Sequence, residues 1–144
     1  MTNNAIAIIK GSSSHPNLRG QACFCSTESG GVIITVEVFG LPENSSSGFF
    51  GMHIHQFGDC TPPFDKTGSH YNPNNQPHPM HAGDLPPLLG NNGYSWMSFY
   101  DTRFTVDEII GKSIIIHNMR DDFTSQPAGD SGDKIGCGII EKGF

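Results

Sequence analysis

The sequence is poor in charge, and above all in positive charge. Only 15% of its 144 residues are charged, and 8 Lys and Arg stand against 14 Asp and Glu, for a formal net charge of -6. Binding of nucleic acid or of an anionic membrane requires a basic surface. We therefore expect no nucleic-acid partner and no membrane partner, and we expect the molecules that this protein meets to be small.

Long hydrophobic runs are also lacking. No segment reaches the roughly 18 apolar residues of a transmembrane helix. Residues Met1 to Lys10 lack the basic start and the long apolar stretch of a secretion signal. The sequence thus predicts a soluble protein, which is cytoplasmic if the chain is complete as given, and extracellular or periplasmic if a signal peptide was trimmed.

Sustained helical periodicity is a third absence. Instead, short β-branched or alternating apolar runs recur between clusters of Gly, Ser, Asn and Pro, which are typical of turns. The predicted strands are Ala5–Ile9, Gln21–Ser26, Val32–Phe39, Phe50–Phe57, Ser95–Tyr100, Ser113–Asn118 and Gly136–Glu141. The apolar segment Val106–Ile116 is interrupted by Gly111 and rich in Ile, which favours a turn into a strand over a helix. Residues 1–144 are therefore predicted to form a single, β-rich domain.

Two stretches do not have the pattern of strands. Gly58–Gly90 is rich in proline, and Met119–Lys134 is polar and contains several glycines. Loops of this length in a compact domain are usually functional. Most of the histidines lie in or beside these two stretches, so the long loops and the candidate chemistry coincide.

His53 and His55 flank Ile54 in an apparent strand, so both imidazoles leave the same face and can hold one metal ion. An isolated pair of this kind is explained equally well by two solvated or hydrogen-bonded histidines. This pair is not isolated, because more potential ligands follow it along the chain. They are His70, His78, His81 and Asp84 in the first loop, and His117 just before the second loop.

The ligand types in this set indicate two different metals. Three histidines and one carboxylate make a filled tetrahedral zinc set, whereas four imidazoles suit copper. Two four-coordinate sites need eight ligands and the set offers seven, so one ligand must be shared. A histidine deprotonated to imidazolate can bridge two ions, and His70 is the natural candidate. The sequence predicts a redox-active copper beside a structural zinc.

Four segments together resemble the copper/zinc superoxide dismutase family, in that family's order. They are GMHIHQFGDC, GSHYNPNNQPHPMHAGDLPPL, IIGKSIIIHNMRDD and GDSGDKIGCGII. The resemblance runs from about Gly51 to Ile140. It implies an all-β Greek-key β-sandwich or flattened barrel of about eight antiparallel strands with two long functional loops. The short interval from His78 to His81 is similar to the compact zinc loops of some bacterial members, which predicts a bacterial-like protein.

The resemblance also implies the site residues, with one copper and one zinc per subunit. Copper is expected on His53, His55, His70 and His117, and zinc on His70, His78, His81 and Asp84. Cys60 and Cys137 match the family's intrachain disulfide. Asp121 matches a carboxylate that orients one copper histidine and one zinc histidine, the alternative being a solvated turn residue.

The family scheme converts two superoxide anions to dioxygen and hydrogen peroxide. Copper cycles between Cu(II) and Cu(I), and His70 serves as bridging imidazolate and proton relay. Where the family usually carries an arginine above copper this chain has Lys134, which lacks the rigid fork of donors and predicts reduced activity. Lys134 and Arg120 are the candidates for guiding the anion electrostatically, and Asp130 and Asp133 are expected to weaken that field.

Two other functions compete with the enzyme. The first is a copper-binding or copper-delivering protein on the same fold, which Lys134 and the pair Cys23 and Cys25 would favour. The second, a zinc hydrolase, would need an open zinc position, and the predicted zinc set is filled. The four copper histidines favour the enzyme. A homodimer is expected because members of the family are often dimers.

Overall fold

The structure of the chain is a computed structural model that describes residues 3–143. Within these residues it contains nine strands, one short α-helix and one 3-10 turn. The elements, in chain order, are β1 (Asn4–Gly11), β2 (Arg19–Ser26), β3 (Val32–Phe39), β4 (Phe49–Phe50), β5 (Met52–His55), η1 (Asp65–Thr67), β6 (Leu88–Leu89), β7 (Ser95–Asp101), α1 (Val106–Ile109), β8 (Ser113–His117) and β9 (Lys134–Lys142).

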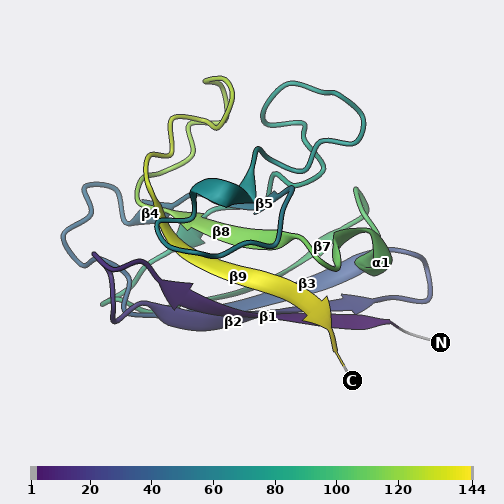
Figure 1. Cartoon of the computed structure of the whole chain (residues 1–144), viewed down its shortest axis with the longest axis horizontal. Helices are drawn as coiled ribbons and strands as arrows, with labels where there is room; N and C mark the ends of the chain where they lie inside the picture. Colours follow the sequence, from purple (N-terminus) through teal and green to yellow (C-terminus); the bar gives the residue numbers. More distant parts are fainter. Residues whose placement is uncertain (1–2, 144) are drawn as a thin grey trace.

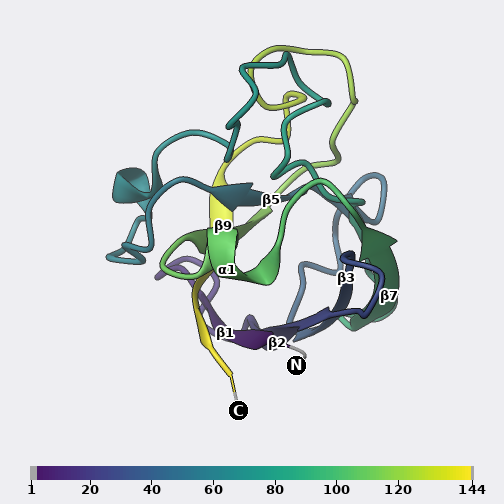
Figure 2. The ribbon, with the colours of Figure 1, turned by 90° about the vertical axis from the view of Figure 1, so that its right-hand side faces the viewer.

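Seven of the strands form one antiparallel sheet in the order β5-β8-β9-β1-β2-β3-β7. The chain leaves β7 at one edge and enters β8 near the other, which is a Greek-key type of connection. Strands β4 and β6 pair with each other, and because β6 also contacts β7 while β4 leads into β5, this short pair lies between the two edges. Figures 1 and 2 show the resulting curl of the sheet. The predicted all-β Greek-key fold is confirmed.

The core lies inside the curl and follows the period of two that strands impose on side chains. In β3, the residues Val32, Ile34, Val36 and Val38 are fully buried, whereas Ile33 between them is 43% exposed. In β2, Phe24 is fully buried, so Cys23 and Cys25 face outward, and both are free thiols. Regular alternation of this kind is why the strand prediction was accurate on these elements.

Three sequence-based predictions need correction. Val106–Ile116 begins with the α-helix α1, because Thr105 and Glu108 form a capping box that satisfies the first backbone N–H groups. The predicted strand Phe50–Phe57 is divided at Gly51 into β4 and β5, and Leu88–Leu89 forms the strand β6 within the stretch predicted to be loop. A side chain at residue 51 would lie 2.8 Å from Cβ of Ser131, so the close approach of the second long loop requires glycine there.

The two long loops lie together on one side of the sheet, beyond β5 and β8 (Figures 1 and 2). They contact each other directly, since the backbone N–H of His78 in the first loop donates to the side-chain oxygen of Gln126 in the second at 2.9 Å. The site residues are therefore enclosed between a rigid sheet and two loops that brace each other.

Candidate metal centre

Strands β5 and β8 supply the histidines that face the loops. His53 and His55 in β5 and His117 at the end of β8 are all buried, as is the intervening Ile54 on the core side. The alternation predicted for the HxH pair is present. Sheet pairing fixes the backbone of these three residues, so their side chains start from rigid positions.

The first long loop is placed by pairing with the free edge of β5. His70 forms a bridge with His55, and Asp84 forms a bridge with His53. Around Ile54, the backbone N–H of Tyr71 donates to its carbonyl and its own N–H donates to Gly83, both at 2.8 Å. The loop residues His70 and Asp84 thus stand beside the strand histidines for the same reason that strands pair.

Four histidines form one group suited to a metal. The ligand atoms of His53, His55, His70 and His117 all lie within 4.8 Å of one another. One ring nitrogen of each is buried without a hydrogen-bond partner. These atoms are Nδ1 of His53 and Nε2 of His55, His70 and His117. Buried polar atoms without partners are rare, and four that converge fit a bound cation.

The remaining nitrogens of this group fix which atoms are free. Nδ1 of His55 donates to the carbonyl of Gly68 at 3.0 Å, and Nδ1 of His117 donates to the carbonyl of Gly132 at 3.1 Å. A carbonyl can only accept, so each Nδ1 carries the proton and each Nε2 presents a lone pair. Burial is the main cause that lowers the pKa of His53 to about 4, of His55 to about 2 and of His117 to about 3. Neutral imidazole is the form that binds metal.

A second group of donors lies directly beside the first. Nδ1 of His70 is 2.8 Å from Oδ1 of Asp84 and 3.1 Å from Nδ1 of His81, and Nδ1 of His78 is 3.1 Å from the same Asp84 oxygen. The donors of this second group that all lie within 4.8 Å of one another belong to His53, His70, His78 and Asp84. His81 nevertheless lies close, with Nδ1 3.2 Å from Oδ2 of Asp84. Three imidazoles and a carboxylate are a donor set that fits zinc.

Asp121 bonds to His53 in the first group and to His78 in the second. Its carboxylate oxygens lie 2.8 Å from Nε2 of His53 and 2.8 Å from Nε2 of His78, and the backbone N–H of Phe123 donates to it. Burial opposes ionisation, but the hydrogen bonds from both histidines and from Phe123 outweigh it and hold the pKa of Asp121 well below its usual range. Asp121 is therefore buried and bonded in the structure, not solvated in a turn.

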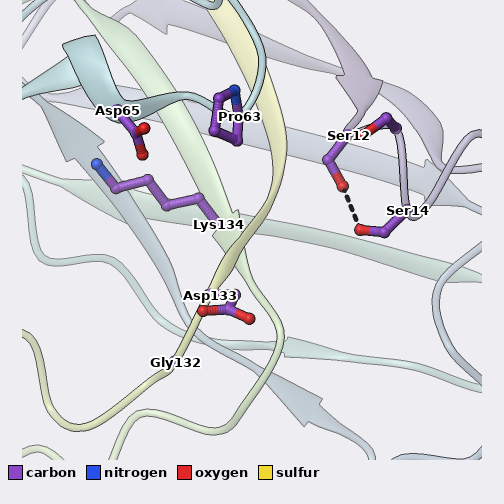
Figure 3. Close-up of a pocket in the computed structure, with 8 residues that line it drawn as sticks. Ser12, Ser14, Pro63, Asp65, Gly132, Asp133 and Lys134 are labelled. Atoms are coloured by element: carbon purple, nitrogen blue, oxygen red, sulfur yellow. Dashed lines mark hydrogen bonds between the residues drawn. The ribbon is translucent and has the colours of Figure 1, made fainter.

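Lys134 borders the approach to the four-histidine group. It lines a cavity of about 550 Å³ together with His55, His70 and His117. Its ammonium donates to Oγ1 of Thr67 at 2.8 Å and to the carbonyl of Phe64 at 3.4 Å. Figure 3 shows its side chain extending toward Asp65 in the neighbouring hollow. Burial lowers the pKa of Lys134, and the nearby Asp65 carboxylate opposes that change.

Arg120 does not join Lys134 at this cavity. It is exposed, and it lines a separate hollow with Pro42 and the serines of 45–47. The structure therefore brings one of the two predicted guiding cations to the site and leaves the other on a different surface.

The disulfide expected from the sequence is present. Cys60 and Cys137 are bonded, with their Cα atoms 5.7 Å apart and a sequence separation of 77. The pair packs against Phe64 and Ile115. The disulfide joins the first long loop to β9, the strand that begins at Lys134.

Sequence analysis missed several groups that complete the site. The carbonyls of Gly68 and Gly132 carry no residue-type signal, because any residue has a carbonyl. Thr67 and Gly129 are equally ordinary in the sequence. A Cβ at residue 129 would lie 1.9 Å from Oδ1 of Asp121, and this glycine has a φ of +68°. Only the folded loops show why glycine stands there.

Comparison with known proteins decides the family. The family profile described as copper/zinc superoxide dismutase matches residues 18–140. The chain belongs to this family. It is similar to superoxide dismutase (Cu-Zn) 3 of Arabidopsis thaliana, with 36% identity covering 94% of this chain and 88% of the relative. It is also similar to superoxide dismutase (Cu-Zn) 2 of Aquifex aeolicus (strain VF5), with 34% identity covering 84% and 78%. Since these relatives include a plant protein and a bacterial one, a specifically bacterial type stays a prediction.

Family membership confirms the predicted activity and cofactors. The chain is a copper/zinc superoxide dismutase, an oxidoreductase that acts on superoxide, and its histidine groups can hold the copper and the zinc that the family uses. No helix among residues 3–143 is long and apolar enough to cross a membrane.

Proposed function

We propose the following assignment of residues to the dismutation of superoxide. His53, His55, His70 and His117 hold copper, and His70, His78, His81 and Asp84 hold zinc, with one ion of each per subunit. The observation that carries the assignment is the set of four buried ring nitrogens without partners, whose opposite nitrogens are bonded to carbonyls or carboxylates. Copper, when bound, supplies the one-electron redox change by which one superoxide is oxidised and the next is reduced.

His70 is proposed as the shared ligand and the catalytic proton carrier. His53 and His70 both occur in the two compact groups, but Nε2 of His53 is bonded to Asp121. His70 alone has one nitrogen, Nδ1, toward Asp84 and the other, Nε2, without a partner on the side of the cavity. Its Nε2 can therefore take up a proton in one half-reaction and return it to the reduced product in the other.

Lys134 is proposed to attract the anionic substrate. Its charge stands at the wall of the cavity in a protein of net charge -6, so it opposes the overall field where the substrate enters. Arg120 is proposed to act only at long range, because it lies outside this cavity. Asp121 is proposed to orient His53 and His78 through their Nε2 atoms.

The test is reconstitution with one copper and one zinc per chain. Dismutation should depend on copper and be absent from the zinc-only form. His55→Ala should abolish it and alter the copper electron paramagnetic resonance spectrum, whereas His15→Ala should change neither, because His15 belongs to neither metal-ligand group and its Nδ1 contacts Ser12 and Ser14. An unchanged spectrum in His55→Ala would contradict the copper assignment. No activity above free copper at full occupancy would instead indicate a copper-binding protein.

The fourth zinc ligand needs its own measurement, because the second compact group contains His53 and not His81, although Nδ1 of His81 lies 3.1 Å from Nδ1 of His70. Cobalt(II) in place of zinc gives visible absorption bands that depend on ligand number and type. His81→Ala should weaken or shift these bands and leave unchanged the spectrum of the copper that His53 is proposed to bind. Unchanged cobalt bands in His81→Ala would assign the fourth position to His53.

Assembly, domain number and compartment are proposals as well. A homodimer is supported by an apolar-lined groove of about 550 Å³ beside the disulfide, where Ile8 is 56% and Ile139 is 38% exposed. Light scattering should give twice the chain mass, and Ile139→Glu should halve it, whereas Trp96→Glu elsewhere on the sheet should not.

If residues 1–144 form one domain, calorimetry of the monomer should show a single unfolding transition. The N-terminus of the native protein, determined by mass spectrometry, decides whether a signal peptide is removed before export.

A further inference from the structure

The zinc-ligand segment His78–Asp84 has two anchors that do not belong to the proposed ligand set. Arg103 follows β7 and bonds to the end of the segment, whereas Gln126 lies in the second long loop and bonds to its start. Neither residue belongs to a recognisable sequence motif.

Arg103 is itself fixed to the end of the sheet. Its backbone N–H donates to Oδ1 of Asp101 at 2.8 Å, and its Nε donates to the same oxygen at 3.3 Å. The Asp101 side chain is buried, whereas that of Arg103 is 40% exposed. Asp101 ends β7 and pairs with Val32 of β3. The guanidinium is therefore held by a rigid strand end, not by a mobile loop.

From this position the guanidinium reaches the zinc-ligand turn. Nη2 of Arg103 donates to the carbonyl of Asp84, and Nη1 lies 3.5 Å from the carbonyl of His81. Inside the turn, the carboxylate of Asp84 accepts from the backbone N–H of His81 at 2.9 Å. The Asp84 carboxylate thus satisfies a backbone N–H group of its own turn, and Arg103 satisfies the backbone carbonyls of His81 and Asp84.

A small hollow borders this turn. It has a volume of about 170 Å³ and is lined in part by Arg103, Asp84, Asp121 and Phe123. A hollow is not packed core, so side-chain hydrogen bonds have more weight in holding the turn here than van der Waals contacts have. The fork of donors on arginine can serve two carbonyls and a carboxylate together, which lysine cannot do.

Gln126 makes a reciprocal contact with His78. Its side-chain oxygen accepts from the backbone N–H of His78 at 2.9 Å, and its side-chain nitrogen donates to the backbone carbonyl of the same residue at 2.8 Å. An amide that pairs with both backbone groups of one residue imitates a strand partner. The imidazole of His78 is held independently by Asp121.

We propose that Arg103 and Gln126 are positioning residues of the zinc site, which hold the backbone of His78, His81 and Asp84 in the binding geometry before zinc arrives. This inference rests on the proposed zinc ligands. Residues that orient metal ligands without touching the metal typically affect metal affinity by about 10-fold to 100-fold. Their loss should act on zinc first, since His55 and His117 are held by the sheet and by other carbonyls.

The test measures zinc directly. We would replace zinc with cobalt(II), record its visible spectrum, and follow transfer of zinc to a chelator in wild type, Arg103→Met, Arg103→Lys and Gln126→Met. Arg103→Met and Gln126→Met should release zinc about tenfold faster and alter the cobalt bands. Arg103→Lys should restore part of the loss. Arg19→Met and Gln21→Met, on the outer face of β2, are matched controls that should behave as wild type.

The outcomes separate the inference from the site assignment. If wild type shows no cobalt bands, the proposed zinc ligands fail. If wild type binds cobalt and the two anchor variants have unchanged spectra and zinc release, the inference is overturned, even where their thermal midpoints fall, because a lower midpoint alone indicates a stabilising role. Altered bands with a normal thermal midpoint would support the positioning role most directly.

Discussion

The ammonium of Lys134 lies 2.8 Å from the hydroxyl oxygen of Thr67, and that hydroxyl is itself buried and donates to the carbonyl of Phe64 at 3.0 Å. Thr67 therefore holds the charge at the cavity wall. Lysine has a flexible stem, so the position of its charge depends on such partners more than that of an arginine would.

We expect Thr67→Val, which keeps the shape and removes the hydroxyl, to lower kcat/KM about threefold by releasing the Lys134 ammonium from its position in the steering field. The loss should shrink at high ionic strength, where steering is screened. Thr35→Val on the outer sheet face is the control. A loss that is independent of salt would show that Thr67 acts by another route.

We expect kcat/KM to depend more on a positive charge at residue 134 than on whether lysine or arginine carries it. Lys134→Met is expected to lower kcat/KM by about tenfold or more and to flatten its dependence on salt, whereas Lys134→Arg should raise it. Asp65→Asn should also raise kcat/KM, because Asp65 opposes the charge of Lys134. Asp107→Asn on α1 changes the net charge equally at a distant place. If Asp65→Asn and Asp107→Asn change kcat/KM equally, Asp65 acts only through the net charge and has no local role.

Gly129→Ala should damage the centre through Asp121. The added Cβ would lie 1.9 Å from Oδ1 of Asp121 and 2.7 Å from Nε2 of His78, so the bond between these residues must break. We expect zinc affinity to fall about 10-fold to 100-fold, measured by competition with a chelator. Gly30→Ala is the control, since it also has positive φ but meets no atom within 4 Å. Similar zinc affinities for the two variants would contradict the proposal for Asp121.

The metal-free protein should lose stability between pH 7 and pH 5. Burial depresses the pKa of His53, His55 and His117, so these stay neutral when folded but gain protons when unfolded, below about pH 6.5. The unfolded state then binds more protons, and each histidine removes up to about 1.4 kcal/mol of stability per pH unit of acidification. The lowered pKa values of Asp84 and Asp121 act only at lower pH. Urea unfolding at the two pH values checks this, and equal stabilities would contradict it.

Removal of the disulfide should cost about 4 to 5 kcal/mol by the chain-entropy relation for a loop of this length. The variant carrying both Cys60→Ser and Cys137→Ser, unfolded by urea in the metal-free state, measures this against Cys23→Ser and Cys25→Ser, which remove the two free thiols. A midpoint like that of the wild type would show that β9 holds the first loop without the bond.

Particular elements show how far the sequence reached. Val32–Phe39 was predicted to the residue, because its alternating Val and Ile side chains respond to a period that the strand itself creates. The helix α1 does not follow from periodicity, because four residues are too few to show it, and its local signal is the capping box of Thr105 and Glu108. Leu88–Leu89 became a strand only because β4 lies beside it.

From the sequence alone the candidate ligands and the family could be predicted, because histidines and an aspartate at these spacings are typical of few other sites. Folding decided which nitrogen of His55 and of His117 is free, because that depends on the carbonyls of Gly68 and Gly132, which any residue could provide. It also decided that Arg120 lies away from the cavity and that Arg103 and Gln126 lie against the zinc-ligand segment. These relationships join residues far apart in the chain through backbone groups, and such groups leave no mark in the sequence.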